Sequence, residues 1–183
     1  TQYAAKGGGE AADDVAAAIE YCYNASSYIV NMPQSVTVTD SGGATLRKRT
    51  ADYDSKGNLR ELDRHLADGT LAATNMEYYS NGNIRQVMGP GNENSERYTL
   101  TYVYDSETQT NITSITDSFG LSSKAGYDPR FGQPKWTTDT NKNCISYAYD
   151  RFGRTSSVTG PYDSINGNTT IDLYYQATPY LPQ

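Results

Sequence analysis

A Tyr-Asp pair recurs along the chain at nearly even spacing, and this repeat restricts the fold more than any other feature. The clear copies are Tyr53-Asp54, Tyr104-Asp105, Tyr127-Asp128 and Tyr149-Asp150, with Tyr79-Ser80 as a weaker copy. These tyrosines are 26, 25, 23 and 22 residues apart. A period of this size is typical of repeat proteins, in which each repeat is one supersecondary unit stacked on its neighbours. The sequence therefore predicts an array rather than a compact domain around a catalytic pocket.

Turn residues follow each tyrosine, and they predict that each repeat contains a β-hairpin. Asp54 can accept a hydrogen bond from a backbone N–H two residues later, and Gly57 can supply the positive φ that closes the turn. Asp150 and Gly153 repeat this spacing. A second, looser turn is expected after each outgoing strand, in the segments 87–90, 115–120, 137–141 and 158–161. From Ser35 onward, the pattern predicts roughly ten to twelve antiparallel strands of about five or six residues.

Three copies vary the first turn. Asn81-Gly82 in the Tyr79 copy predicts a shortened, two-residue hairpin. The turn after Tyr127 is lengthened, and the turn after Tyr104 has lost its glycine and is expected to be longer and looser. The residues that define the repeat are Tyr53, Asp54, Gly57, Tyr79, Gly82, Tyr104, Asp105, Tyr127, Asp128, Gly132, Tyr149, Asp150 and Gly153.

The N-terminal part departs from the repeat. Residues 1–9 are small and Gly-rich, which is typical of a flexible lead-in. From Glu10 to about Tyr23, apolar residues fall at helical spacing behind an acidic start, so a short helix packed on the sheet is expected. The predicted organisation is a lead-in and helix over 1–32, a β-sheet array over 33–163, and a final partial repeat or tail over 164–183.

The complete units resemble the Rhs or YD-repeat family. The resemblance rests on the segment Tyr147-Ala148-Tyr149-Asp150-Arg151-Phe152-Gly153-Arg154 and on Tyr102-Val103-Tyr104-Asp105 with the turns that follow them. It covers about residues 33–163, and residues 138–162 are especially similar to the YD-repeat region of the B component of bacterial toxin complexes. Teneurins carry a related barrel. The expected fold is all-β, an array of antiparallel hairpins forming a curved sheet or shell segment, with one short N-terminal helix.

The resemblance implies a structural role. The chain would be a segment of a hollow shell that encapsulates a toxic C-terminal cargo domain, within a larger bacterial protein that is secreted or displayed at the cell surface. Its partners would be the enclosed cargo polypeptide and the rest of the Rhs shell. The family's aspartate-dependent self-cleavage segment has no counterpart here, so no protease residues are carried over. The alternative is an extracellular module that binds carbohydrate or a protein partner, motivated by the tyrosines and Trp136.

Composition narrows the classes of partner. The net charge of −6 and the pI of about 4.7 argue against nucleic acid, since the one cationic cluster, Arg47-Lys48-Arg49, fits a solvated strand face. No apolar run approaches the roughly 18 residues that span a bilayer, so direct membrane insertion by this segment is not expected. The chain is 36% apolar and holds 17 tyrosines, which suits thin layers with half-wet faces.

Catalysis, a metal site and a cofactor are not expected. His65 is the only histidine and has no second ligand at a metal-binding spacing. The repeated aspartates stand at the same point of each unit, which favours turn chemistry over paired catalytic carboxylates. Trp136 could be a sugar-stacking platform, but packing over a neighbouring strand is favoured. Cys22 and Cys144 are expected to be free, partly buried thiols.

Overall fold

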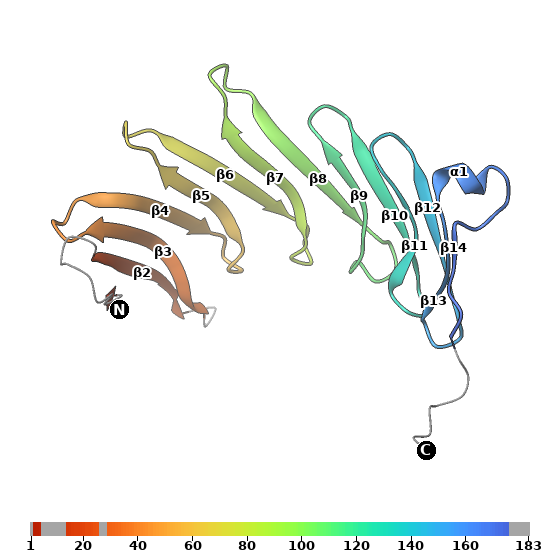
Figure 1. Ribbon diagram of the computed structural model, residues 1–183. Helices are drawn as coiled ribbons and strands as arrows, with labels where there is room; N and C mark the ends of the chain where they lie inside the picture. The colour runs from red at the N-terminus through yellow and green to blue at the C-terminus, as the bar shows by residue number, and fades with distance from the viewer. Residues whose placement is uncertain (1, 5–13, 26–28, 176–183) are drawn as a thin grey trace. The chain divides into compact units, whose positions relative to one another are not determined.

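The computed structural model describes residues 2–4, 14–25 and 29–175, and the regular secondary structure in these ranges is almost entirely β-strand. Each strand pairs with the next one along the chain, and every pairing recorded is antiparallel. This order follows from the short connections, which allow hairpins but no crossovers. The predicted all-β fold of antiparallel hairpins is confirmed (Figure 1).

The chain forms two compact units, Thr1–Leu100 and Thr101–Gln183, and strand β8 (Arg97–Tyr104) carries the boundary. The strands of the first unit before β8 are β1 (Gln2–Ala4), β2 (Val15–Asn24), β3 (Ile29–Asp40), β4 (Thr45–Tyr53), β5 (Leu59–His65), β6 (Leu71–Tyr78) and β7 (Ile84–Gly91). The elements of the second unit after β8 are β9 (Ile112–Asp117), β10 (Ser122–Asp128), β11 (Gln133–Thr138), β12 (Cys144–Tyr149), β13 (Thr155–Thr159), α1 (Pro161–Ser164) and β14 (Ile171–Asp172).

The expected N-terminal helix is wrong. The described part of that segment, residues 14–23, belongs to strand β2 or directly precedes it, and residues 10–13 lie outside the described residues. Ile19 pairs with Val36 and Ala17 with Val38 of β3. The segment carries apolar residues at both helical and alternate spacing, and pairing with the adjacent β-branched strand decides between them. The expected flexible lead-in lies outside the described residues, apart from the three residues of β1.

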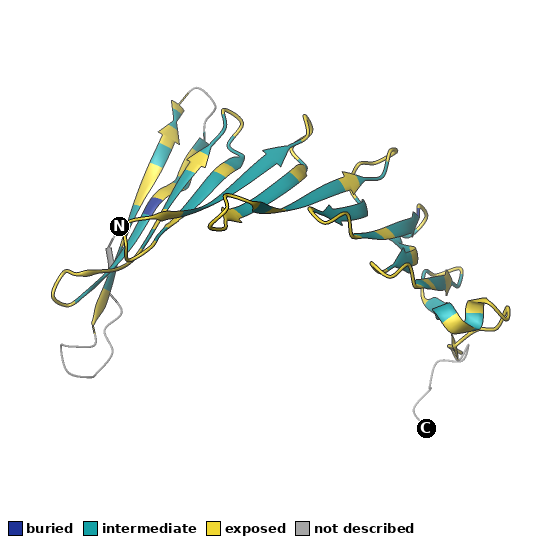
Figure 2. Ribbon diagram, turned by 90° about the horizontal axis from the view of Figure 1, so that it is seen from above, coloured by how far each residue is buried: buried dark blue, intermediate teal, exposed yellow. Residues whose placement is uncertain are grey.

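The described residues form no apolar core. No hydrophobic side chain is fully buried among them, and the two buried residues are Ser35 and Asp128, which are both polar (Figure 2). A single sheet without a covering layer leaves both faces half-wet, as the Tyr-rich composition predicts. Cohesion must therefore come from the backbone ladder, from cross-strand side-chain pairs and from the turns at the two edges.

A short insertion interrupts the repeat near the C-terminal end. The expected turn at 158–161 is absent, because β13 ends at Thr159 and α1 follows. The chain then returns to the sheet, where the N–H of Thr170 donates to the carbonyl of Val158 and that of Leu173 to the carbonyl of Ser156. β14 therefore lies on β13 as the next strand of the array. Within the described ranges, no helix is long and apolar enough to span a bilayer.

Candidate functional site: the tyrosine edge

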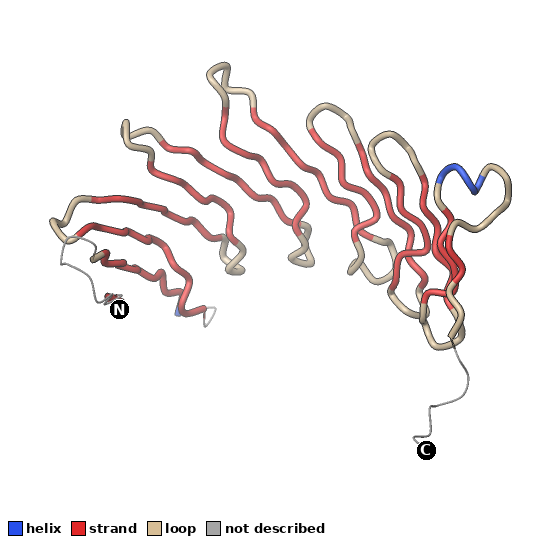
Figure 3. Tube along the Cα trace, viewed as in Figure 1, coloured by secondary structure: helices blue, strands red, loops and turns tan. Residues whose placement is uncertain are grey.

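Successive turns alternate between the two ends of the strands (Figure 3). We call the end that carries the turns following the repeat tyrosines the tyrosine edge. In the described residues it consists, in the first unit, of the turns 54–58 and 79–83 and, in the second unit, of the turns 105–111, 128–132 and 150–154, each with the tyrosine before it. The geometry of this edge repeats from hairpin to hairpin, and it holds most of the residues that the sequence singles out.

Four of the repeat tyrosines lie next to a shift in strand register. Asp52 pairs with Glu61 whereas Tyr53 pairs with Leu59, so Arg60 is an extra residue on the outgoing strand. The same shift occurs in three further hairpins, at Tyr78, Tyr127 and Tyr149. A β-bulge of this kind locally increases twist and redirects the side chain beside it.

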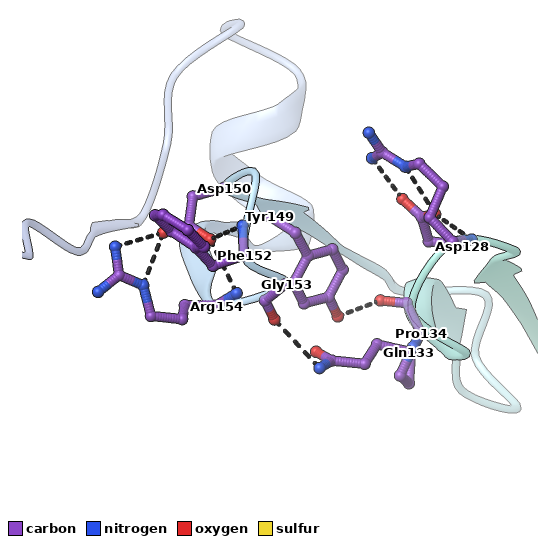
Figure 4. A network of polar contacts seen from close by, with 9 residues as sticks. Asp128, Gln133, Pro134, Tyr149, Asp150, Phe152, Gly153 and Arg154 are labelled. Atoms are coloured by element: carbon purple, nitrogen blue, oxygen red, sulfur yellow. Dashed lines mark hydrogen bonds and ion pairs between the residues drawn. The ribbon is translucent and has the colours of Figure 1, made fainter.

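The hydroxyl groups of five repeat tyrosines each donate to a backbone carbonyl of the preceding hairpin. The donor–acceptor pairs are Tyr53 to Pro33 (2.9 Å), Tyr78 to Leu59 (2.8 Å), Tyr127 to Ile112 (3.0 Å), Tyr149 to Pro134 (2.6 Å) and Tyr175 to Thr155 (3.0 Å). Figure 4 shows the Tyr149 bond beside the turn that follows it. Burial raises the pKa of Tyr149, so the hydroxyl stays a neutral donor.

The residue whose carbonyl accepts the tyrosine bond is also the strand partner of the previous repeat tyrosine. Leu59 pairs with Tyr53 and accepts from Tyr78. Pro134 pairs with Tyr127 and accepts from Tyr149 in the same way. These hairpins are thus fastened to the bulge of the one before, and the predecessor resists a displacement of the hairpin that follows it.

Two tyrosines of this series are missed by the sequence pattern. Tyr21 stands at a register shift and pairs with Pro33, which accepts the bond from Tyr53, so it belongs to the first hairpin. Tyr175 bonds to Thr155, the residue that pairs with Tyr149. Tyr21 is obscured by the helical spacing around it, and Tyr175 is followed by Gln where the other copies carry Asp. A search for tyrosine at the repeat period without its aspartate would find Tyr175.

The second repeat must be shifted by one residue. The N–H of Tyr79 bonds to Asn83 and that of Gly82 to the carbonyl of Tyr79, as Asp54 does with Asn58 and Gly57. Tyr79 therefore occupies the aspartate position, and Tyr78 is the repeat tyrosine. The turn is not shortened to two residues as predicted; it has the same length as the Asp54 turn. The tyrosines of the series are therefore Tyr21, Tyr53, Tyr78, Tyr104, Tyr127, Tyr149 and Tyr175.

The turn aspartates accept hydrogen bonds from the backbone that they enclose. Oδ1 of Asp54 accepts from the N–H groups of Lys56 and Asn58, both at 2.8 Å. Asp150 does the same with Phe152 and Arg154, and Arg154 also forms an ion pair with it (Figure 4). Hydrogen bonds to a carboxylate favour its charged form. The side-chain bond from Asn58 accordingly lowers the pKa of Asp54, although burial opposes this.

The Tyr104 turn is longer than the others, as predicted, but it is not loose. Asp105 accepts four backbone N–H groups, from Thr108, Gln109, Thr110 and Asn111. The N–H of Asn111 makes the largest contribution to lowering the pKa of this carboxyl. Gln109 adopts the positive φ of 55° that glycine supplies in other copies. The carboxylate organises a loop that lacks the expected glycine.

The turns at the opposite edge use the same chemistry rather than a looser one. The N–H of Gly120 bonds to the carbonyl of Asp117, whose Oδ1 accepts from Phe119 and Leu121. Asn92 organises its turn in the same way, so β7 runs through to Gly91. The turn predicted at 87–90 is therefore wrong, because the residues that close it lie at 92–96.

Trp136 packs against a strand. It pairs with Gly126 of β10, and its indole ring occupies the space that a Cβ atom at position 126 would require. An aromatic ring laid across a glycine on the neighbouring strand covers exposed backbone. The side chain remains 36% exposed, but one face of the ring is already in use. This contact agrees with the interpretation that Trp136 packs over a neighbouring strand, and not with its use as a sugar-stacking platform.

The remaining candidates do not converge on a reaction centre. Nε2 of His65 lies 3.1 Å from the hydroxyl of Thr50 on the neighbouring strand. In the part of the chain that the structure describes, no group of three His, Cys, Asp or Glu side chains is placed to hold a metal ion. Cys22 and Cys144 are free and half-buried. The feature that recurs along the tyrosine edge is the hydroxyl bond from one hairpin to the one before it.

Fold and joints together define an array of β-hairpins, in which tyrosine hydroxyl groups fix hairpins to their predecessors within each of the two compact units. The sequence matches no protein-family model and no curated protein. Solved structures of the TcdB2–TccC3 toxin complex share the fold. The form without its hypervariable C-terminal region aligns with a TM-score of 0.61 at 12% identity, over 80% of this chain and 11% of that chain. The TcdB2–TccC3–Cdc42 structure gives a TM-score of 0.52 at 17% identity, over 80% of this chain and 8% of that chain. The chain thus spans only about a tenth of these relatives.

Proposed function

We propose that the chain is a non-enzymatic wall segment of a shell related to the toxin complexes, and that the shell encloses a cargo polypeptide. The observation that carries the proposal is the fastening of each hairpin to the previous bulge through a tyrosine hydroxyl, for instance Tyr149 to Pro134 at 2.6 Å. Such joints suit a sheet that must extend over many repeats and keep its register without an apolar core.

The absence of a buried apolar core among the described residues supports the same role. A single-layer sheet exposes both of its faces to solvent, and no described hydrophobic side chain is fully buried. A wall of this kind can separate an interior from the surroundings with little material. The shared fold with the TcdB2–TccC3 structures supports a secreted protein whose partners are other parts of the same shell and the enclosed chain.

Protease protection tests the proposal. The protein that carries this array with its cargo is compared with a variant that lacks residues 33–163, and cargo digestion is followed by mass spectrometry. The intact array is expected to protect the cargo, and its deletion is expected to expose it. A second variant with Phe at positions 78, 127 and 149 keeps the chain length but removes three joints, and partial exposure is expected. Equal digestion of the cargo with and without the array would contradict the wall function.

A further inference from the structure

Neighbouring turns on the tyrosine edge touch where a side chain of one reaches over the next. Phe131 precedes the positive-φ residue Gly132, and its ring lies across the next turn. A Cβ atom at Gly153 would lie 2.9 Å from Cδ1 of Phe131. The ring centroid of Phe131 is 6.2 Å from that of Tyr149. An aromatic side chain therefore fills the space between the turns 128–132 and 150–154.

The first unit has equivalent contacts. Ile29 lies against Gly57, where an added Cβ atom would meet Cδ1 of Ile29 at 3.0 Å. Lys56, which precedes Gly57, stretches to the next turn and donates from Nζ to the carbonyl of Ser80 at 3.1 Å. Lys56 bridges this space without filling it, because a hollow of about 660 Å³ remains there, and its lining includes the basic side chains of Lys56, Arg60 and Arg85.

The space between the turns 105–111 and 128–132 is open. The residue that precedes the positive-φ position there is Thr108, and its short side chain bonds back to Asp105. An added Cβ atom at Gly132 would meet no described atom within 4 Å. A hollow of about 610 Å³ remains, which we call the Tyr104 groove, lined by Tyr104, Glu107, Thr108, Tyr127, Pro129 and Gly132 among others.

The charge of the groove restricts what can enter it. Its lining includes the carboxyl groups of Asp105 and Glu107 and neither Lys nor Arg. Asp105 is engaged by the backbone of its own turn, whereas Glu107 is exposed at the rim. In the filled equivalent, the guanidinium carbon of Arg130 lies 5.0 Å from the ring centroid of Phe131. An aromatic residue beside a basic one therefore matches both the shape and the charge of the groove.

We propose that the Tyr104 groove is a binding site for an extended polypeptide that presents an aromatic side chain next to Arg or Lys. The ring takes the place that Phe131 takes in the neighbouring space, between Tyr104 and Tyr127 and over Gly132. The basic side chain lies beside Glu107. The groove belongs wholly to the second unit and does not depend on the array being part of a shell, so the test below is separate from the cargo-protection test.

The probe is a fluorescein-labelled peptide, Asp-Pro-Arg-Phe-Gly-Gln, which copies residues 128–133, together with a matched peptide carrying Ala in place of Phe. Binding to the full chain is measured by fluorescence anisotropy. Saturable binding is expected for the first peptide, with affinity about ten-fold or more lower for the second, because the buried ring supplies most of the apolar contact. Equal binding of the two peptides, or no binding of either, would overturn the proposal.

Two variants of the chain locate the site. Thr108→Phe supplies a ring at the position equivalent to Phe131 and is expected to abolish peptide binding, whereas Thr140→Phe adds a ring to an exposed turn of the opposite edge and is expected to leave it unchanged. Glu107→Lys is expected to weaken binding several-fold at low salt, even if Thr108→Phe disturbs folding. Unchanged binding in both groove variants would contradict the assignment. If the free chain self-associates and Thr108→Phe abolishes this self-association, the occupant of the groove is a second copy of the chain, and the proposal of a separate polypeptide is overturned.

Discussion

The hydroxyl group of Tyr78 donates a 2.8 Å hydrogen bond to the carbonyl oxygen of Leu59, the residue that pairs with Tyr53 in the preceding hairpin. This relationship connects two bulges that are one repeat apart. It recurs between Tyr149 and Pro134 in the second unit. The stability of such an array is a sum of terms for single hairpins and terms for neighbours, and the tyrosine bond belongs to the second kind.

Removal of the Tyr175 hydroxyl is expected to loosen the last strand. Tyr175→Phe deletes the bond to Thr155 but keeps the ring, which lies 4.0 Å below the guanidinium carbon of Arg154. We expect the free energy of unfolding to fall by about 0.5–1 kcal/mol, and amide exchange at residues 170–173 to become faster. The control is Tyr174→Phe, since Tyr174 is 92% exposed. Equal effects of the two substitutions would contradict the role given to Tyr175.

Introduction of the missing turn aspartate is expected to stabilise the second repeat. Tyr79→Asp places a carboxylate where it can accept from the N–H groups of residues 81 and 83, as Asp54 does in the turn before, and it would replace Oδ1 of Asn81, which now accepts from Asn83 at 3.1 Å. We expect a gain of about 0.5–1 kcal/mol in the free energy of urea unfolding. Tyr79→Leu, which supplies no acceptor, is expected to give no gain. A loss with Asp would show that the Tyr79 ring matters more than the turn.

Gly126→Ala is expected to displace the indole ring of Trp136. A Cβ atom at position 126 overlaps that ring, so the side chain must leave its place on the strand. We expect destabilisation of about 1–3 kcal/mol and a red shift of the tryptophan emission, which comes from one residue only. In the Trp136→Leu background, Gly126→Ala is expected to lower the free energy of unfolding by less than it does in the unsubstituted chain. An unchanged emission spectrum would contradict the packing of Trp136 on Gly126.

Acid is expected to weaken the array through its turn carboxyl groups. The side-chain hydrogen bond from Arg130 lowers the pKa of Asp128 to about 2 in the folded chain, against about 3.9 when unfolded. Asp128 therefore contributes stability that is present above about pH 4 and is lost as the pH falls towards 2. Urea unfolding at pH 7, 4, 3 and 2 measures this slope. Asp128→Asn is expected to flatten this slope, whereas Glu93→Gln, in an exposed turn, is expected to leave the slope of the unsubstituted chain unchanged.

The repeat itself is readable from the sequence because turn chemistry is local. Asp54 and Gly57 occupy positions that only a few residue types fill, so the hairpins and their antiparallel order can be predicted. The position of the second repeat cannot be predicted from Tyr79-Ser80, because this pair shares only its tyrosine with the Tyr-Asp motif. Gly82 sets that position: it lies three residues after Tyr79, as Gly57 lies three after Asp54.

The joints between hairpins cannot be predicted from a single repeat. The bond from Tyr149 to Pro134 depends on a bulge that inserts Lys135, and nothing in the local sequence marks that extra residue. The strand at 15–24 is set by pairing with β3, which outweighs the helical preference of its alanines. The Tyr104 groove likewise appears only when adjacent turns are placed side by side.

The central claim is that a repeat tyrosine whose hydroxyl bonds to the preceding hairpin couples the two hairpins, and native-state hydrogen exchange of Tyr149→Phe tests this most directly. The substitution is expected to speed amide exchange both in β12 and β13, which flank the tyrosine's own turn, and in β11, which supplies the acceptor Pro134. Tyr147→Phe on the same strand is the control and is expected to leave β11 unchanged. Faster exchange confined to β12 and β13 would contradict the coupling.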